Sequence, residues 1–391
     1  MEKVVVTNVE SLYAECVGHK VDIYGAKTVA QRACHYLELR GINIDSFIVS
    51  NRFKNPDVIR NKQVNRIEEE NRVYDCIVLA VSGTFVWDVE EELEDYNINK
   101  LVILSPLMID EFPTSCLVSD LSKISERAFI SSKVQVFSDE GSSISIDNNV
   151  VVKDGAIILA LNNSKIHIKR GAYIEEKTFI TADDNSEIVI SENSILQERS
   201  SLKATEDSTI LLGKKFSMGY MSSLSAAKNS SAKFGEKVSI GELSYISAQM
   251  ESEVRFEGEN VILQNANVNA WRGGGISVGR KTCFNSNLFM TVEQSDIIIG
   301  NDNMFSHFVK MSTGNHKVID KKSGEDITNR SKIRIGNHVW VGMGAILLPG
   351  CDVGNNCIVG AAAVVTKSMA PNTACAGNPA VVIKRDIDWE R

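Results

Sequence analysis

The chain has 391 residues, which is too long for one ordinary globular core and predicts two or three structural units. Its net charge is −8 with a pI near 5.5, and it contains no block of five or more basic residues, which argues against a nucleic-acid-binding surface. Eight scattered cysteines without a Cys-X-X-Cys pair, no signal-peptide core and no segment of membrane-spanning length lead us to expect reduced thiols, no metal site and a cytoplasmic protein.

Residues 1–112 alternate short apolar runs with helical patterns. Strands are predicted at 21–24, 42–49, 76–81 and 101–104, and helices at 27–40 and 88–96. This alternation predicts a parallel α/β sheet, that is, a Rossmann-like domain. The turn GAKTVA after the first strand lacks the second and third glycines of a dinucleotide-binding loop, so a structural or sugar-nucleotide-binding role is favoured over NAD.

A repeat begins after the polar, serine-rich residues 113–143, which we interpret as a linker and the first cap of a solenoid. From residue 144 to residue 296, apolar residues fall at six-residue steps in triplets, and the interval from Ile146 to Ile168 separates the start of every triplet from the start of the next. The triplets are Ile146, Val152, Ile158; Ile168, Ile174, Ile180; Ile190, Leu196, Leu202; Leu212, Met218, Leu224; Phe234, Ile240, Ile246; Phe256, Ile262, Val268; and Val278, Phe284, Met290.

A six-residue period is neither helical nor that of an ordinary strand. It predicts one short strand and one turn per unit, with three units closing a triangular coil whose apolar side chains point inward. The polar segments LNNSK, ADDNSE, ATEDST and AAKNSS predict a four-residue extension at one corner of each coil, which accounts for the long interval between triplets. Stacked coils of this kind form a β-solenoid, whereas an antiparallel sandwich would need hairpin turns and alternating polarity.

The last part of the repeat, residues 297–391, has a break. Ile299, Phe305 and Met311 keep the six-residue step, but the next coil does not begin until Ile335, far beyond one ordinary interval. We therefore predict that residues 312–332 leave the coil as a loop. After it the coils tighten to three six-residue steps without an extension, with Ile335, Val341, Leu347, Val353, Val359 and Val365 pointing inward before a C-terminal tail.

The segment IGNHVWVGMGAILLPGCDVGNNCIVGAAAVVTKSMAPNTACAGNPA, which starts at Ile335, resembles the acetyl-CoA-binding end of the hexapeptide-repeat acyltransferases. The resemblance is to capsular and lipopolysaccharide O-acetyltransferases of this family, and it implies a left-handed parallel β-helix. It also implies acetyl-CoA as donor without a metal, a carbohydrate acceptor, and a homotrimer whose active sites lie between neighbouring solenoids. The N-terminal IYGA and GINIDSFIVSN are similar to domains of bacterial surface-glycan enzymes that hold a nucleotide-sugar.

Acyl transfer to a hydroxyl needs a general base, and histidine titrates near neutral pH. His316 opens the predicted loop in MSTGNHKVID and resembles the histidine of the family that deprotonates the acceptor, although Asn315 stands where glycine often precedes it. His307, after the inward Phe305, is either a helper or a bystander. The remaining histidines are interpreted as structural or surface residues: His19, His35, His167 and His338.

Asn287, in CFNSNLF, matches a family asparagine that binds the acceptor or the oxyanion. The alternative is a turn asparagine that satisfies backbone groups.

The resemblance also implies the residues that bind the cofactor. Trp340 matches a tryptophan that walls the thioester end of the cofactor tunnel, and the small residues at 342, 361 and 362 match positions along the pantetheine arm. Basic residues near the end of the chain would meet the phosphates, although Val381 stands at one expected basic position and solvated charges are the alternative. The full set is Trp340, Gly342, Ala361, Ala362, Thr366, Lys367, Lys384 and Arg385.

The resulting hypothesis is an acetyl-CoA-dependent O-acetyltransferase that modifies a hydroxyl of a bacterial capsule or lipopolysaccharide through direct attack assisted by His316. Two alternatives remain open: N-acetylation of a nucleotide-linked amino sugar, and a non-catalytic polysaccharide-binding or scaffold solenoid. A loop that breaks the coil at a histidine argues against the scaffold.

Overall fold

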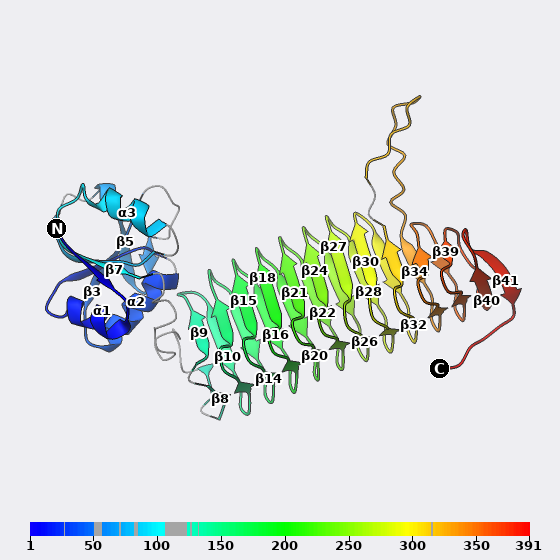
Figure 1. The fold of residues 1–391 in the computed structure, drawn as a ribbon, viewed down its shortest axis with the longest axis horizontal. Helices are drawn as coiled ribbons and strands as arrows, with labels where there is room; N and C mark the ends of the chain where they lie inside the picture. The colour runs from blue at the N-terminus through cyan, green and yellow to red at the C-terminus, as the bar shows by residue number, and fades with distance from the viewer. Residues whose placement is uncertain are drawn as a thin grey trace. The chain divides into compact units, whose positions relative to one another are not determined.

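The structure, a computed structural model, describes the chain except residues 27, 51–56, 70–71, 82–84, 106–122, 126, 132 and 314–315. The chain forms two compact units, one of Met1–Ser119 with Val136–Gly141 and one of Asp120–Gln135 with Ser142–Arg391. The first is an α/β unit and the second is a parallel β-solenoid (Figure 1). None of the helices in the described ranges combines the length and the apolar character that crossing a bilayer requires.

The α/β unit is built on one seven-stranded sheet in the order β1-β7-β6-β2-β3-β5-β4. Its strands are β1 Glu2–Val6, β2 Val21–Tyr24, β3 Ile44–Val49, β4 Val58–Ile59, β5 Lys62–Arg66, β6 Tyr74–Leu79 and β7 Ile98–Leu104. Its helices are α1 Val9–Cys16, α2 Thr28–Leu39, the 3-10 helix Ile67–Glu69 and α3 Phe85–Leu93. The pairs are parallel except β4 with β5, so the expected alternation of strands and helices is present, while the Rossmann-like assignment stays a prediction.

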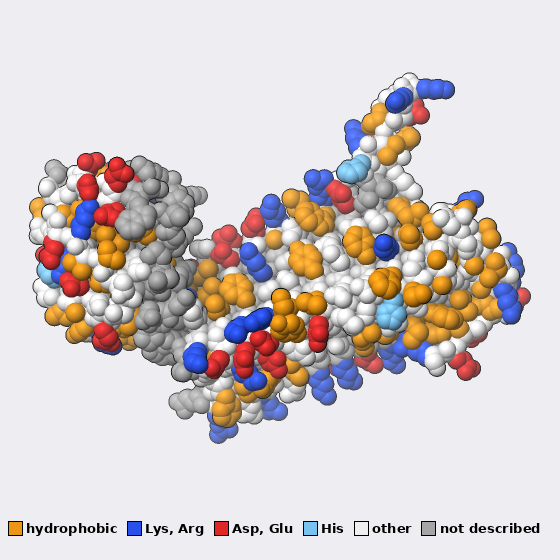
Figure 2. Space-filling view, viewed as in Figure 1, with side chains coloured by type: hydrophobic (Ala, Val, Ile, Leu, Met, Phe, Trp, Pro, Cys, Tyr) orange, Lys and Arg blue, Asp and Glu red, His pale blue; other side chains and the backbone are white. Residues whose placement is uncertain are grey.

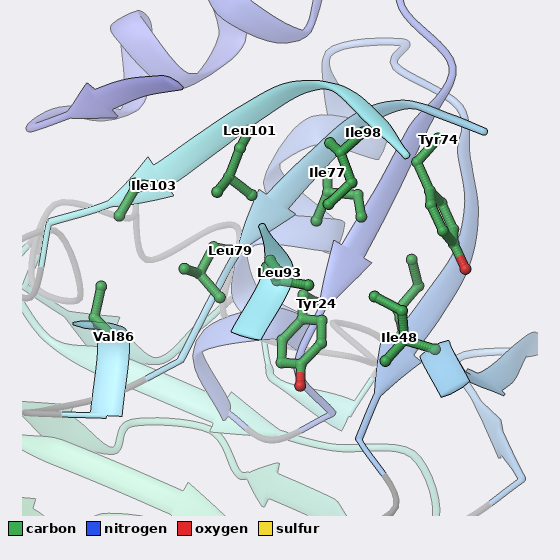
Figure 3. Close-up of a cluster of buried hydrophobic side chains, with 11 residues drawn as sticks. Tyr24, Ile48, Tyr74, Ile77, Leu79, Val86, Leu93, Ile98, Leu101 and Ile103 are labelled. Atoms are coloured by element: carbon green, nitrogen blue, oxygen red, sulfur yellow. The ribbon is translucent and has the colours of Figure 1, made fainter. Parts of the chain in front are cut away.

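Apolar side chains from this sheet and α3 form a buried core (Figure 3). Ile77 and Leu79 of β6 point to the same face as Leu101 and Ile103 of β7, because alternate residues of a strand share a face. The cluster also contains Tyr24, Ile48, Ile67, Tyr74, Val86, Leu93 and Ile98.

Gly25 follows β2 and lies against the residue that follows β6. A Cβ at Gly25 would lie 2.7 Å from the carbonyl oxygen of Ala80, and its φ is +121°. Close packing and the positive φ therefore explain why glycine stands at this turn, without a bound dinucleotide.

Three sheets form the solenoid, because each coil adds one strand to each sheet in turn (Figure 1). Their strand pairs are parallel except β40 with β41. The ten-stranded sheet contains β10 Ser143–Ile146, β13 Lys165–Ile168, β16 Glu187–Ile190, β19 Thr209–Leu212, β22 Ser231–Phe234, β25 Glu253–Phe256, β28 Gly275–Val278, β31 Asp296–Ile299, β34 Ile333–Ile335 and β37 Asp352–Val353. The thirteen-stranded sheet contains β8 Phe129–Ile130, β11 Val151–Val152, β14 Tyr173–Ile174, β17 Ile195–Leu196, β20 Ser217–Met218, β23 Ser239–Ile240, β26 Val261–Ile262, β29 Cys283–Phe284, β32 Met304–Phe305, β35 Trp340–Val341, β38 Ile358–Val359, β40 Thr373–Ala376 and β41 Val381–Arg385. The eleven-stranded sheet contains β9 Gln135–Ser138, β12 Ile157–Ala160, β15 Phe179–Asp183, β18 Ser201–Thr205, β21 Ser223–Ala227, β24 Tyr245–Gln249, β27 Asn267–Trp271, β30 Phe289–Glu293, β33 Lys310–Ser312, β36 Ile346–Leu347 and β39 Val364–Val365.

The predicted six-residue repeat is confirmed by the register and the burial. Ile144 pairs with Ile166 and Ile166 with Ile188, so the interval read from the sequence is the interval between paired strands. After the break the interval shortens as predicted, because Ile335 pairs with Val353. Every apolar residue that the repeat places inside is buried, with an exposed fraction of at most 4%. The parallel β-solenoid is therefore present, whereas its hand stays a prediction.

The solenoid begins inside the stretch interpreted as linker and cap. Ile124 bridges Ile146, and β8 and β9 complete this first coil. Within the predicted linker and cap, residues 113–122, 126 and 132 lie outside the described residues.

Three columns of corners connect the sheets. We call them the first, second and third corners, which follow the strands of the ten-, thirteen- and eleven-stranded sheets respectively. The third corner carries the extension: Asn162 and Asn163 adopt left-handed φ values, and the buried Ser164 follows. The Ser164 Oγ accepts a hydrogen bond of 3.0 Å from the Ser186 N–H of the next coil, and Ser186 does the same for Ser208. The repeated polar corners thus satisfy their own buried backbone groups.

A chain of phenylalanine rings runs through the core of five successive coils. Ring centroids are separated by 4.6–6.3 Å between neighbours in this order: Phe216, Phe234, Phe256, Phe284 and Phe305. These contacts join the coils around the long loop to those before it.

The predicted loop forms an arm that leaves the third corner after β33 and returns at β34 (Figure 1). Ile319 forms an antiparallel bridge with Asp326, and the Ile327 N–H donates to the Val318 carbonyl at 2.9 Å. At the tip, the Asp320 carboxylate accepts from the backbone N–H groups of Lys322 and Ser323. We call residues 313–332 the arm, and its outer part is a hairpin instead of an irregular loop.

Candidate functional site

Several residues singled out in the sequence lie along the second corners of successive coils. Asn287 follows β29 with φ +64°, and the neighbouring Ser286 carbonyl accepts from the Phe308 N–H at 3.1 Å. The next coil is joined in the same way, because the Gly344 N–H donates to the His307 carbonyl at 2.9 Å. The structure therefore brings Asn287 and His307 into one column with the corners at 342–345 and 360–363.

Trp340 stands at the edge of this column, on the outer face of β35. Its side chain is exposed, with a residue exposure of 39%, and its indole Nε1 donates to the Ser306 hydroxyl at 3.3 Å. Ser306 belongs to the second corner of the preceding coil, so this hydrogen bond fixes the indole beside the column. The outward position agrees with the place of Trp340 in the repeat.

A strip of small residues follows Trp340. Ala361 and Ala362 are exposed, and the Ala362 N–H donates to the Met343 carbonyl at 2.8 Å, which stacks the two corners. A Cβ at Gly342 would lie 2.6 Å from the Ala361 backbone nitrogen, so only glycine fits there. The side chains at 342, 361 and 362 are therefore all small, and a narrow linear molecule could lie along them.

His316 lies elsewhere, in the arm at the third corner. It is exposed and lines a groove of about 610 Å³ whose other lining residues are Trp271, Arg272, Thr291, Val292, Glu293, Gln294, Lys317 and Arg330. Asn287 is not among them. Asn287 lies at the second corner before β30, whereas His316 follows β33 at a third corner, so the two residues lie at opposite ends of the strands of the eleven-stranded sheet. One chain alone therefore does not bring them together.

Ion pairs organise the wall of the groove. The Arg272 guanidinium lies 2.7 Å from the Glu293 carboxylate, and Arg330 lies 3.2 Å from Asp326. Hydrogen bonds from the Thr328 hydroxyl and N–H, assisted by Arg330, lower the pKa of Asp326 to about 2. Asp326 is therefore ionised throughout the neutral range and keeps Arg330 in place. In the part of the chain that the structure describes, no three His, Cys, Asp or Glu side chains gather as a metal site would require.

The groove was not predicted from the sequence, although the repeat contains a signal for it. Glu253 of β25 pairs with Gly275 of β28 at the regular interval, but Gly275 pairs with Asp296 of β31, one position short of that interval. The third corner at Gln294 consequently has one left-handed residue where the preceding corner has two, Arg272 and Gly273. This shortened corner leaves a recess between the preceding corner and the arm.

The remaining predicted residues lie near the C-terminal end of the solenoid. Thr366 and Lys367 follow β39 at the third corner and are exposed. Lys384 and Arg385 are exposed on β41, which pairs antiparallel with β40. Among the described residues, none of these three basic side chains has an acidic partner within ion-pair distance, so they are available to an anion.

His338 is held by the C-terminal tail. Its Nδ1 lies 2.7 Å from the Asp302 carboxylate, its Nε2 lies 2.9 Å from the Trp389 carbonyl oxygen, and its ring stacks on Trp389 at 4.3 Å. The Trp389 indole returns a hydrogen bond to the His338 carbonyl at 2.8 Å. Because both ring nitrogens face acceptors, first the Trp389 carbonyl and then Asp302, the pKa of His338 is raised. These contacts support the structural role expected for His338.

Comparisons with known proteins agree with this arrangement of coils. The family described as "Bacterial transferase hexapeptide (six repeats)" matches residues 332–367. A galactoside O-acetyltransferase of Lactococcus lactis subsp. lactis (strain IL1403) is 34% identical over 131 residues, which cover 34% of this chain and 62% of that protein. A polysialic acid O-acetyltransferase of Escherichia coli O1:K1 / APEC is 29% identical over 123 residues, which cover 31% of this chain and 40% of that protein.

Among solved structures, the polySia specific acetyltransferase NeuO is 20% identical with a TM-score of 0.33, and the match covers 64% of this chain and 90% of that one. The match to this chain covers only 62% of the Lactococcus protein and 40% of the Escherichia coli O1:K1 / APEC protein.

Proposed function

We propose that this chain, whose C-terminal coils are hexapeptide repeats of the bacterial transferase family, is an acetyl-CoA-dependent O-acetyltransferase acting on a hydroxyl of a bacterial surface carbohydrate. The observation that carries the proposal is the break in the solenoid: an arm that carries His316 leaves the coil after β33 and lines a groove. A spacer or scaffold has no need of such a break. Relatives named for O-acetylation of galactosides and of polysialic acid support the choice of oxygen and of a carbohydrate.

His316 acts as the general base in this proposal. Its imidazole takes the proton of the acceptor hydroxyl while the hydroxyl oxygen attacks the thioester carbonyl carbon. The tetrahedral intermediate then expels the coenzyme A thiolate, which recovers the proton from His316. The Asn287 amide donates a hydrogen bond to the developing oxyanion.

The donor would lie along the second corner. Trp340 would cover the acetyl end, and the strip at Gly342, Ala361 and Ala362 would hold the pantetheine arm. Thr366 and Lys367 would contact the far part of the molecule. Lys384 and Arg385, which lack acidic partners among the described residues, would meet its phosphates. Because acetyl-CoA is a cytoplasmic metabolite, we place the reaction in the cytoplasm.

The separation of His316 from the second-corner column supports assembly into a homotrimer. In a closed ring of three subunits, His316 of each subunit would face the second-corner column of its neighbour. Each of the three active sites would then contain both the base and the donor-binding residues. The arm carries Val318, Ile319 and Ile327 as exposed apolar side chains, which a neighbouring solenoid would cover.

The test measures transfer from labelled acetyl-CoA to a panel of capsular oligosaccharides and nucleotide amino sugars. We expect His316→Ala to lower turnover by about two to four powers of ten, with acetyl-CoA affinity nearly unchanged. His167→Ala is the matched control, because His167 is another partly exposed histidine, on the outer face of β13 in an early coil. An alkali-labile labelled product that is lost in His316→Ala supports the proposal, whereas an alkali-stable amide product would favour N-acetylation. Wild-type turnover in His316→Ala would refute the assignment of His316 as the general base.

A further inference from the structure

The groove beside His316 continues along the third corner toward earlier coils. A second hollow of about 420 Å³ is lined by Lys228, Met250, Glu251, Arg272, Gly273 and Gln294. It shares Arg272 and Gln294 with the first, so the two form one trough. We use the term trough for the residues of both hollows together.

The trough is much longer than a single sugar. Lys228 belongs to the third corner after β21, and His316 belongs to the arm after β33, four coils later. With about 4.8 Å between neighbouring strands of a sheet, the trough extends roughly 19 Å. Charged side chains follow this edge of the solenoid from the base of the arm (Figure 2). A chain of several sugar units fits such a length.

The wall of the trough offers the contacts that a sugar ring needs. Trp271 is 40% exposed, which is unusual for an indole unless something covers it. The adjacent Arg272 and Glu293 form an ion pair with donors and acceptors that hydroxyl groups can share. The indole face would pack on the apolar face of a pyranose, and the ion pair would orient its hydroxyls.

The charge of the trough favours an anion. Its cationic side chains are Lys228, Arg272, Lys317 and Arg330, and its anionic side chains are Glu251 and Glu293. With Asp326, which pairs with Arg330, four positive charges meet three negative ones. The chain as a whole carries −8. Within the described residues, neither Lys228 nor Lys317 has a carboxylate within ion-pair distance. A positive strip on an acidic protein attracts an acidic ligand locally.

We infer that the trough binds an anionic glycan chain of several units and presents one of its hydroxyls at His316. The inference rests on the proposed function, and it narrows the acceptor to an acidic polysaccharide or long acidic oligosaccharide. Lys228 is then a binding residue four coils before the arm that carries His316, whereas Trp271 is one that lines the same hollow as His316.

The test uses the full chain carrying His316→Ala, so that binding is measured without turnover. Sialic acid oligomers from dimer to octamer are the anionic probes, and maltooligosaccharides of the same lengths are the neutral ones, in calorimetric titrations. We expect affinity to rise with length for the anionic series only. Lys228→Gln should weaken octamer binding about two- to five-fold with little effect on the dimer, because Lys228 lies at the far end of the trough. Trp271→Ala should weaken octamer binding about ten-fold and should affect the dimer as well, because Trp271 lies beside His316.

Lys237→Gln is the matched control, because Lys237 is also exposed with a positive φ but lies at a first corner. The inference is overturned if affinity does not depend on length, if neutral oligomers bind equally well, if no oligomer binds, or if the control weakens binding as much as Lys228→Gln. Acetyl transfer by the wild-type chain is measured in parallel. Transfer without length dependence refutes the trough alone, whereas length-dependent binding without transfer to any acceptor refutes the proposed function alone.

Discussion

Replacing Gly342 by alanine should push apart the stacked second corners that carry the proposed donor-binding strip of Gly342, Ala361 and Ala362. The new Cβ would lie 2.6 Å from the Ala361 nitrogen and 2.9 Å from the Gly360 carbonyl carbon, and both are backbone atoms that cannot rotate away. The two corners must separate, which strains the 2.7 Å hydrogen bond from the Gly342 N–H to the Val359 carbonyl. Overpacking of this kind costs about 1–3 kcal/mol and a weakened hydrogen bond about 1 kcal/mol, so we expect a loss of about 2–4 kcal/mol.

Amide hydrogen exchange measures this loss where it occurs, because each coil of a solenoid depends mainly on its neighbours. Peptides that cover residues 358–365 should exchange about 30- to 900-fold faster in Gly342→Ala, since about 1.4 kcal/mol is a factor of ten. Gly344→Ala is the control: a Cβ there meets nothing within 4 Å, and its φ of +70° alone costs about 1 kcal/mol. Unchanged exchange in Gly342→Ala, or a larger effect in Gly344→Ala, would refute the reasoning.

Three further substitutions test other parts of the molecule. Phe256→Ala breaks the chain of phenylalanine rings and should cost about 3–5 kcal/mol in a denaturant titration, whereas Phe256→Leu should cost clearly less; equal losses would contradict ring packing. The raised pKa of His338 means that the stabilisation from its contact with Trp389 is fully present below the unfolded pKa of 6.5 and is lost as pH rises through the higher folded value. Protection of the amides of residues 386–391, taken relative to their intrinsic exchange rate at each pH, should fall over this range, and His338→Gln should remove that change in protection. Ile327→Ser on the arm should weaken the proposed trimer by about 2 kcal/mol per contact, seen as dissociation on dilution in analytical ultracentrifugation, while Ile327→Val keeps it; identical sedimentation would place the interface elsewhere.

The solenoid could be predicted from the sequence in detail because its order is one-dimensional. A strand pair such as Ile166 with Ile188 is dictated by a fixed step along the chain, so the spacing of apolar residues is enough to assign both register and burial. No comparable rule covers the α/β unit. There, β1 pairs with β7 across nearly the whole length of the unit, and the amphipathic pattern of α1 is short and follows a strand that is mostly exposed.

The site was predictable in part, for a related reason. Trp340, Gly342 and the alanines at 361 and 362 fall on one column because the repeat places them there. The trough depends instead on two irregular features. One is the coil before Asp296, which is one residue shorter than the regular interval, and the other is the arm, whose path does not follow the repeat. Trp271 and Arg272 therefore become neighbours of His316 only in three dimensions.

The exact register of the early coils makes the length of the solenoid modular. Lys165 occupies the same place in its coil as Glu187 does in the next, so joining Ser164 directly to Glu187 would recreate each strand pair and the serine hydrogen bond. A gene could thus gain or lose a segment of one coil by duplication or deletion without disturbing the coils from Lys228 onward. We expect a chain lacking residues 165–186 to fold with an unchanged melting profile for the C-terminal coils. The length of the solenoid could then change by whole turns while the proposed site stays as it is.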